Sequence, residues 1–151
     1  MIEIAKKFTE CASSLPDWLY TTIARFAVGF TFLLSGLTKV DENYMVQSKT
    51  FALFEDIYFA KLPLPDALLT PLTYIATYSE LILPLLLFVG LFSRFAALGL
   101  LIMTLVIQFI VFPDQILTYK EHGLWAVALL AILIRGPGPF SLDYILGRAV
   151  R

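Results

Sequence analysis

The chain has 151 residues, of which 59% are hydrophobic and 15% charged, and its formal net charge is −1. A soluble domain of this size carries about 25% charged residues, so the composition favours an integral membrane protein over a soluble one. The near-neutral charge gives no sign of a nucleic-acid partner, and none is predicted.

Four apolar blocks follow one another along the chain. Three of them have about the 20 residues that a helix needs to cross a bilayer, and the fourth is shorter. None alternates as the strands of a membrane β-barrel do. The sequence therefore predicts an all-α, integral membrane four-helix bundle, as one domain over residues 1–151 in a lipid bilayer. The predicted spans are residues 18–37, 71–91, 94–112 and 122–135.

The first predicted span carries polar and small residues at steps of three and four, which places them on one helix face. Arg25 lies about two turns inside one end of the span, and Lys39 follows the other end. Gly29 and Gly36 allow a neighbouring helix to approach closely. We expect this face to point into the bundle, because lipid is a poor partner for polar groups.

The connection between the first and second spans is long and aromatic. It holds Phe51, Leu53, Phe54, Ile57, Tyr58 and Phe59. The following Leu-Pro-Leu-Pro run, residues 62–65, ends any helix because proline lacks the N–H group. The pattern predicts an interfacial segment in an extracytoplasmic loop, lying over the mouth of the bundle. Such a segment is either a linker that rests on the membrane or a lid over a cavity.

Glu80 lies near the middle of the second span, in a run that is otherwise almost wholly apolar. A carboxylate at the bilayer centre costs roughly 2.5–3.5 kcal/mol on insertion scales, so it is usually buried against a partner. Thr77 lies one turn before Glu80 on the same face. At about 1.5 Å rise per residue, Arg25 and Glu80 are expected at similar depths, which predicts an Arg25–Glu80 pair.

Gln108 lies on the third span, and His122, the only histidine, begins the fourth. With Arg25 and Glu80 they are expected to form a polar column across the bundle, closed at its outer end by Lys39. His122 is either an interfacial hydrogen-bonding residue or a ligand, to a haem iron or a quinone carbonyl. One histidine and one carboxylate are too few for a tightly held metal ion, so no metal site is predicted.

The tail after the fourth span predicts a short amphipathic helix. Two glycines and two prolines follow Arg135 and end the span. Ser141 is suited to cap a helix over residues 142–150. Arg148 on that helix and Arg151 after it suit anionic lipid headgroups.

Basic residues near the span ends predict the orientation. With four spans, one side holds both termini and six Lys and Arg residues: Lys6, Lys7, Arg94, Arg135, Arg148 and Arg151. The other side holds four: Lys39, Lys49, Lys61 and Lys120. Both termini are therefore expected in the cytoplasm. Trp18 and Trp125 are expected in the aromatic belts at the membrane surfaces.

Cys11 is the only cysteine in the sequence. The chain therefore has no intrachain disulfide and no Cys-x-x-Cys unit, and it cannot shuttle electrons through paired cysteines.

Four stretches, taken together and in this order, resemble the DoxX family of small bacterial membrane proteins. They are Arg25 to Lys39 with Gly29 and Gly36, Glu80 to Arg94 with Pro84 and Gly90, His122 before the last span, and the Gly-Pro-Gly-Pro-Phe-Ser-Leu-Asp run at residues 136–143. The longer aromatic connection, with Pro63 and Pro65, departs from the family pattern. The resemblance implies a four-helix protein of the bacterial cytoplasmic (inner) membrane. It also implies a link to membrane redox complexes, since related proteins include a subunit of a thiosulfate:quinone oxidoreductase.

The leading hypothesis is a membrane oxidoreductase subunit without catalytic cysteines, in a quinone-linked complex with other protein subunits or further copies of the chain. Glu80 and Arg25 are the candidate catalytic residues, Glu80 to accept or relay a proton and Arg25 to hold it charged or orient it. The candidate residues for binding a cofactor, a quinone or a haem, are His122, Gln108, Lys39 and Thr77. The alternatives are a small transporter or permeation subunit that uses the polar column, and a structural anchor in which Arg25 and Glu80 only fix helix packing.

Overall fold

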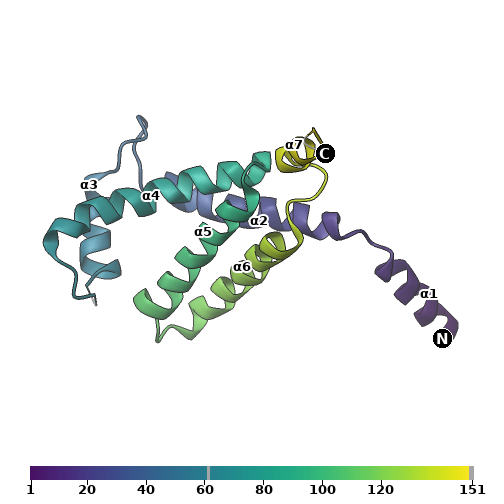
Figure 1. Cartoon of the computed structure of the whole chain (residues 1–151). Helices are drawn as coiled ribbons and strands as arrows, with labels where there is room; N and C mark the ends of the chain where they lie inside the picture. The colour runs from purple at the N-terminus through teal and green to yellow at the C-terminus, as the bar shows by residue number, and fades with distance from the viewer. Residues whose placement is uncertain (61, 150–151) are drawn as a thin grey trace.

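The structure consists of helices and short connections. The computed structural model describes residues 1–60 and 62–149, without the side chains of residues 11, 12, 148 and 149. Lys61, Val150, Arg151 and the side chain of Arg148, which entered the predictions above, lie outside the described residues. The elements are α1 (Ile2–Ser13), α2 (Asp17–Leu37), α3 (Ser48–Leu53), the π-helical turn η1 (Phe54–Tyr58), α4 (Asp66–Val89), α5 (Ser93–Val106), the π-helical turn η2 (Ile107–Val111), α6 (Ile116–Arg135) and α7 (Leu142–Ala149) (Figure 1).

In the described part of the chain, four helices are long and apolar enough to cross a membrane: α2, α4, α5 continued by η2, and α6. The prediction of an all-α membrane bundle with four spans is therefore confirmed. α2 packs against α4 and α6, and α5 packs against the same two helices, so the four spans form a closed ring. The ring encloses an apolar core of Val28, Phe32, Leu87, Ala96, Ala97, Leu100, Leu101, Leu129 and Ile132.

Two spans begin earlier than predicted. α4 begins at Asp66 and not at residue 71, because Pro65 is the extended N-cap residue and Pro71 is tolerated inside the helix. α6 begins at Ile116 and not at residue 122. His122 therefore lies in the second turn of α6, within the span, and does not mark its start.

The close approach of α2 and α4 depends on small residues. A Cβ atom on Gly36 would lie 3.1 Å from the carbonyl carbon of Glu80, and one on Gly29 would lie 2.6 Å from the ring of Phe88. A Cβ on Gly29 would have to displace the Phe88 ring, and one on Gly36 would crowd the main chain of Glu80, so both glycines allow α2 to lie close to α4. The role predicted for Gly29 and Gly36 is confirmed.

Arg25 is fully buried and donates hydrogen bonds only to main-chain carbonyls among the described residues. Its Nε donates to Leu87 O (2.8 Å), and Nη2 donates to Phe88 O (2.9 Å). Its Nη1 donates to Pro137 O (2.7 Å) and to Phe140 O (3.1 Å). The last carbonyls of a helix have no partner within the helix and carry partial negative charge, so a guanidinium is well matched to the end of α4.

The predicted Arg25–Glu80 pair is therefore wrong. The prediction placed both residues at similar depths from the rise per residue within the predicted spans. α4 instead runs from Asp66 to Val89, and its last turn, about 10 Å beyond Glu80, lies level with Arg25.

Asp143 joins the turn between α4 and α5 to the start of α7. Its carboxylate accepts hydrogen bonds from Phe92 N and Ser93 N, both at 2.8 Å, at the start of α5. Its own main-chain N–H donates to Gly90 O (2.9 Å). Gly90 ends α4 in the left-handed conformation (φ 72°) that glycine adopts without a steric penalty. The turn is thus closed by a residue that is distant in sequence.

α7 confirms the predicted short C-terminal helix, although Val150 lies outside the described residues. The Ser141 hydroxyl accepts a hydrogen bond from Tyr144 N (3.2 Å), which is the predicted capping contact. Leu142, Ile145 and Leu146 are exposed on the surface of α7. The apolar residues of this helix therefore face away from the protein core.

α1 was not predicted from the sequence, and it projects away from the bundle beyond the start of α2 (Figure 1). Ile4 and Phe8, one turn apart, are both exposed. α1 has an amphipathic sequence, and its apolar residues have no cover from the bundle.

We predict that Arg25→Ala lowers the free energy of unfolding by about 3 kcal/mol, because four buried carbonyls lose a charged donor. Arg25→Lys should give an intermediate loss, since an ammonium cannot match the planar fork. The measurement is unfolding of the purified protein in mixed micelles with a denaturing detergent. Arg94→Ala is the control and should change stability by less than about 0.5 kcal/mol, because Arg94 is exposed. An Arg25→Ala protein as stable as the control would contradict this role.

Candidate functional site

Glu80 is buried and forms an ion pair with Lys39. Both residues are 5% exposed, and Lys39 Nζ donates to Glu80 Oε2. Lys39 Nζ also donates to Ser35 Oγ (2.8 Å) and Ser35 O (3.4 Å). All three N–H groups of the ammonium are thus in use, which fixes its position. Lys39, and not Arg25, is the cation beside Glu80.

The chain holds Lys39 in place from both sides. Gly36, one turn earlier on α2, contacts the backbone of Glu80 and sets the two helices at the separation that the pair needs. The carbonyl of Lys39 accepts hydrogen bonds from Thr50 Oγ1 (2.8 Å) and Gln47 N (3.0 Å). The start of α3 is therefore anchored directly to the residue that pairs with Glu80.

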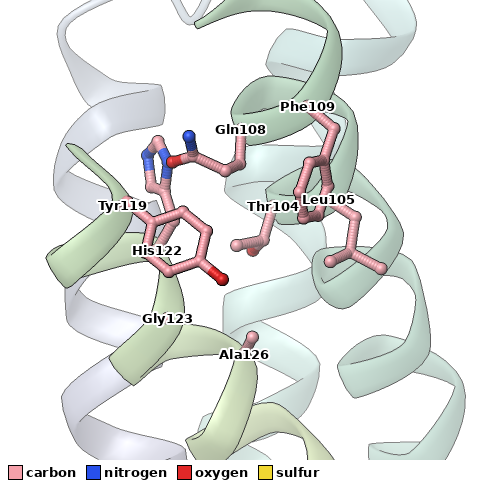
Figure 2. Close-up of a pocket in the computed structure, with 8 residues that line it drawn as sticks. All are labelled: Thr104, Leu105, Gln108, Phe109, Tyr119, His122, Gly123 and Ala126. Carbon is pink, nitrogen blue, oxygen red and sulfur yellow. The ribbon is translucent and has the colours of Figure 1, made fainter. Parts of the chain in front are cut away.

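Gln108 orients His122 on the other side of the bundle. Gln108 Nε2 donates to Phe112 O (3.1 Å), so its Oε1 is the atom that lies 2.7 Å from His122 Nδ1. Oε1 only accepts hydrogen bonds, so Nδ1 carries the hydrogen. In the neutral imidazole, Nε2 then keeps its lone pair. Figure 2 shows the two side chains pointing toward each other. Thr118 Oγ1 lies 3.4 Å from the same Oε1.

Glu80 and His122 line one cavity of about 130 Å³, which we call the central cavity. Polar side chains from α2, η1, α4 and α6 line this cavity. Aromatic rings from α2, from α6 and from the residue after η2 form other parts of its wall. Its lining residues are Thr31, Phe32, Ser35, Tyr58, Glu80, Ile107, Phe112, Thr118, His122 and Trp125. An apolar cavity of about 150 Å³ binds one benzene molecule, so the central cavity has the size of a single ring.

Tyr58 reaches the central cavity from the long connection. Its ring stacks on Phe54 (4.8 Å between centroids) and meets Phe112 edge-on (6.0 Å). Burial, and next the negative charge of Glu80, raise the pKa of the Tyr58 phenol, so it stays a hydroxyl that can donate. Of the two interpretations of this connection, the structure therefore supports a lid over a cavity.

Trp125 forms part of the cavity wall. Its ring lies 5.6 Å from that of Phe32 and 4.9 Å from that of His122, measured between centroids. The place of Trp125 in an aromatic belt stays a prediction, and its half-buried ring also contributes to the cavity wall. Trp18 packs against Phe140 at 5.2 Å, and its place in a belt stays a prediction.

The predicted polar column does not form as one path. Glu80, Lys39, Gln108 and His122 come together, but Arg25 lies at the far end of the α2–α4 interface. Buried apolar residues fill the interval between them: Val28, Phe32, Leu81, Pro84 and Leu87. A permeation path along this interface loses its polar continuity there.

Thr77 is fully buried one turn from Glu80, and within the described part of the chain its hydroxyl has no hydrogen-bond partner. It does not line the central cavity. Its candidate role in binding a cofactor therefore has less support than that of His122.

Four polar residues of the central cavity were not predicted from the sequence: Ser35, Thr31, Thr118 and Tyr58. Ser35 lies one turn from Lys39 on the same helix face, and this spacing was the available signal. Tyr58 belonged to the aromatic cluster of the connection, but no pattern distinguished it from its neighbours. Thr118 lay before the predicted start of its span.

The site suits a small organic ring better than a haem or a metal ion. Among the described residues, no group of three or more His, Cys, Asp and Glu side chains is placed to hold a metal. A haem has four pyrrole rings around its iron, and a cavity of about 130 Å³ accepts one ring.

The chain is similar to a known protein family and to a bacterial protein. The sequence pattern of the DoxX family matches residues 20–113. A protein of Haemophilus influenzae, known only as an uncharacterized protein, is 31% identical over 132 residues, which cover 82% of this chain and 81% of the relative. No solved structure matches the chain.

We predict a large coupling energy between Lys39 and Glu80. Lys39→Met leaves a buried carboxylate without its cation and should cost about 3 kcal/mol or more. Adding Glu80→Leu should recover much of that loss, because an apolar pair of similar volume needs no partner. Unfolding of the two single variants and the double variant in mixed micelles measures the coupling. If the stability losses of the two single variants sum to that of the double variant within about 0.5 kcal/mol, Lys39 and Glu80 have no coupling energy.

Proposed function

The chain belongs to the DoxX family of membrane proteins, and from this premise we propose that it is a membrane subunit of a quinone-linked redox complex, with the central cavity as the headgroup site. The observation that carries the proposal is the placement of a carboxylate and an imidazole on one aromatic-lined cavity of single-ring size. A quinone headgroup is one ring with two oxygens, so it needs this combination of flat apolar walls and polar partners.

Glu80 and His122 each have one atom available to a ligand. Glu80 Oε2 is bonded to Lys39, and within the described residues no hydrogen bond to Oε1 is found. His122 Nδ1 is bonded to Gln108, and in the same part of the chain no hydrogen bond to Nε2 is found. Both free atoms are acceptors, which suits them to receive the O–H hydrogens of a reduced quinone.

Neighbouring residues position the Glu80 carboxylate and the His122 imidazole. Lys39 keeps a positive charge beside Glu80, the role that the sequence analysis gave to Arg25. Gln108 sets the His122 tautomer, and the Tyr58 hydroxyl is a donor on the lid side. A bound quinone would supply two-electron, two-proton chemistry, in which Glu80 and His122 would each accept one proton from the reduced form and the two electrons would go to a carrier on a partner subunit.

The partner subunit is a necessary part of the proposal. Cys11 is the only cysteine, so this chain has no dithiol to hold the two electrons. We therefore infer that the electron carrier lies on another protein of the complex, and that this chain supplies the membrane-embedded quinone site.

We further propose that the protein lies in a bacterial cytoplasmic membrane with both termini in the cytoplasm. Arg94 at the start of α5 and Arg135 at the end of α6 lie on the side of the termini, since each successive span reverses direction. Arg135 pairs with Asp17 at the start of α2 (2.9 Å), in keeping with this arrangement. Basic residues on this side favour the cytoplasm.

We predict that Glu80→Gln abolishes quinone binding while the protein still reaches the membrane. Wild-type protein purified gently from native membranes should carry about one quinone per chain, measured by extraction and mass spectrometry, and any quinone-dependent turnover of the complex should fall at least about 100-fold in the variant. Glu121→Gln is the matched control, because Glu121 is exposed on α6 next to His122. Normal quinone content in Glu80→Gln would sink the proposal.

The orientation is tested by cysteine labelling in intact cells. In a Cys11→Ser background, Glu3→Cys should be protected from a membrane-impermeant maleimide, and Asn43→Cys should react, since both positions are exposed. Permeabilised cells should label both positions and so provide the control. The reverse pattern in intact cells would show that the termini lie outside.

A further inference from the structure

A second, smaller pocket opens between α5 and α6 and shares a wall with the central cavity. Its volume is about 90 Å³, and its lining includes Gln108 and Phe109 from η2 and Tyr119, His122 and Gly123 from α6. We call this pocket the lateral slot. Figure 2 shows Leu105 and Phe109 on one side of the slot and Tyr119 on the other.

The lateral slot and the central cavity share one lining residue, His122, whereas Gln108 lines only the slot. The hydrogen-bonded pair of Gln108 and His122 therefore lies at the boundary between the slot and the Glu80 side of the bundle. A passage between the two spaces would require this pair to move.

The outer side of the slot is lined by side chains that are exposed on two of the spans. Phe109 is 61% exposed and Tyr119 is 57% exposed, on helices that cross the membrane. Other residues of the wall are small: Ala126 lines the slot, and a Cβ atom added to Gly123 would meet nothing within 4 Å. The slot therefore exists because α6 presents no bulky side chain at this position.

The backbone beside the slot is itself irregular. In η2, Phe112 N donates to Ile107 O (2.9 Å), five residues back, in place of the usual four. Such π-helical turns occur frequently at functional sites. Gln108 belongs to this turn, so it lies on a segment after α5 whose main-chain hydrogen bonds depart from the regular pattern.

We infer that the lateral slot is the passage for the tail of a lipid-soluble quinone, whose ring lies in the central cavity and whose methyl-branched hydrocarbon chain leaves between α5 and α6 into the bilayer. The inference rests on the proposed function and names its substrate class as long-tailed, membrane-borne quinones. A polar inner space joined to an apolar outer opening matches the two ends of such a molecule. Gln108 and His122 then lie at the point where the ring and its tail meet.

Binding of two probes tests the passage. One is a quinone with a long isoprenoid tail, presented in liposomes, and the other is the same ring without a tail. Gly123→Leu fills the slot and favours the helix over glycine, so the protein should still fold. We expect this variant to bind the long-tailed quinone at least about tenfold more weakly than wild type and to bind the tail-less quinone unchanged.

Gly147→Leu is the matched control, because a Cβ at Gly147 on α7 also meets nothing within 4 Å, and it should bind both probes like wild type. Unchanged binding of the long-tailed quinone by Gly123→Leu would overturn the passage and leave the proposed function standing. Failure of wild-type protein to bind either probe would overturn both. Equal loss of both probes in Gly123→Leu would show damage to the central cavity and overturn a passage specific to the tail.

Discussion

Arg25 donates to four main-chain carbonyls, and the arrangement of the other helices depends on these bonds. A guanidinium inside a membrane bundle has no water to bond with, so the protein must supply every partner. Here the partners are the last carbonyls of α4 and the loop between α6 and α7. One side chain on α2 therefore sets how far α4 extends beside it and where the chain turns after α6. Asp143 closes the same end by capping α5.

The two buried cations, Arg25 and Lys39, are expected to have different roles because their surroundings differ. Among the described residues, Arg25 forms no salt bridge and donates only to main-chain carbonyls, which is typical of a structural contact. The Lys39 ammonium is equally well bonded, but its partner Glu80 borders the central cavity. With the Arg25 end fixed, Gly36 brings α2 against Glu80 and completes that pair. Chemistry is therefore expected at one end of the α2–α4 interface, and rigidity at the other.

The residues of the site come from several membrane spans and from the long connection between the first two. Glu80 and His122 come from membrane spans that do not follow one another in the chain, and Gln108 comes from the π-helical end of α5. Tyr58 comes from the long connection that departs from the DoxX pattern. The bundle thus supplies the carboxylate and the imidazole, whereas the connection supplies one wall of the cavity. A different connection on the same bundle would change the shape of the cavity without moving Glu80 or His122.

The sequence by itself determined the membrane class, the four spans, the glycine face of α2 and the burial of Glu80 against a partner, because hydropathy and helical spacing are local properties. It also grouped His122 and Gln108 with Glu80, since Gln108 interrupts one apolar span and His122 begins the next. Only the tertiary structure decided that Glu80 meets Lys39 and not Arg25. The relative depth of two antiparallel helices depends on where each one ends, and here α4 began and ended earlier than its hydropathy predicted. Tyr58 likewise needed the fold, because the position of a long connection follows from contacts with distant helices and not from its own pattern.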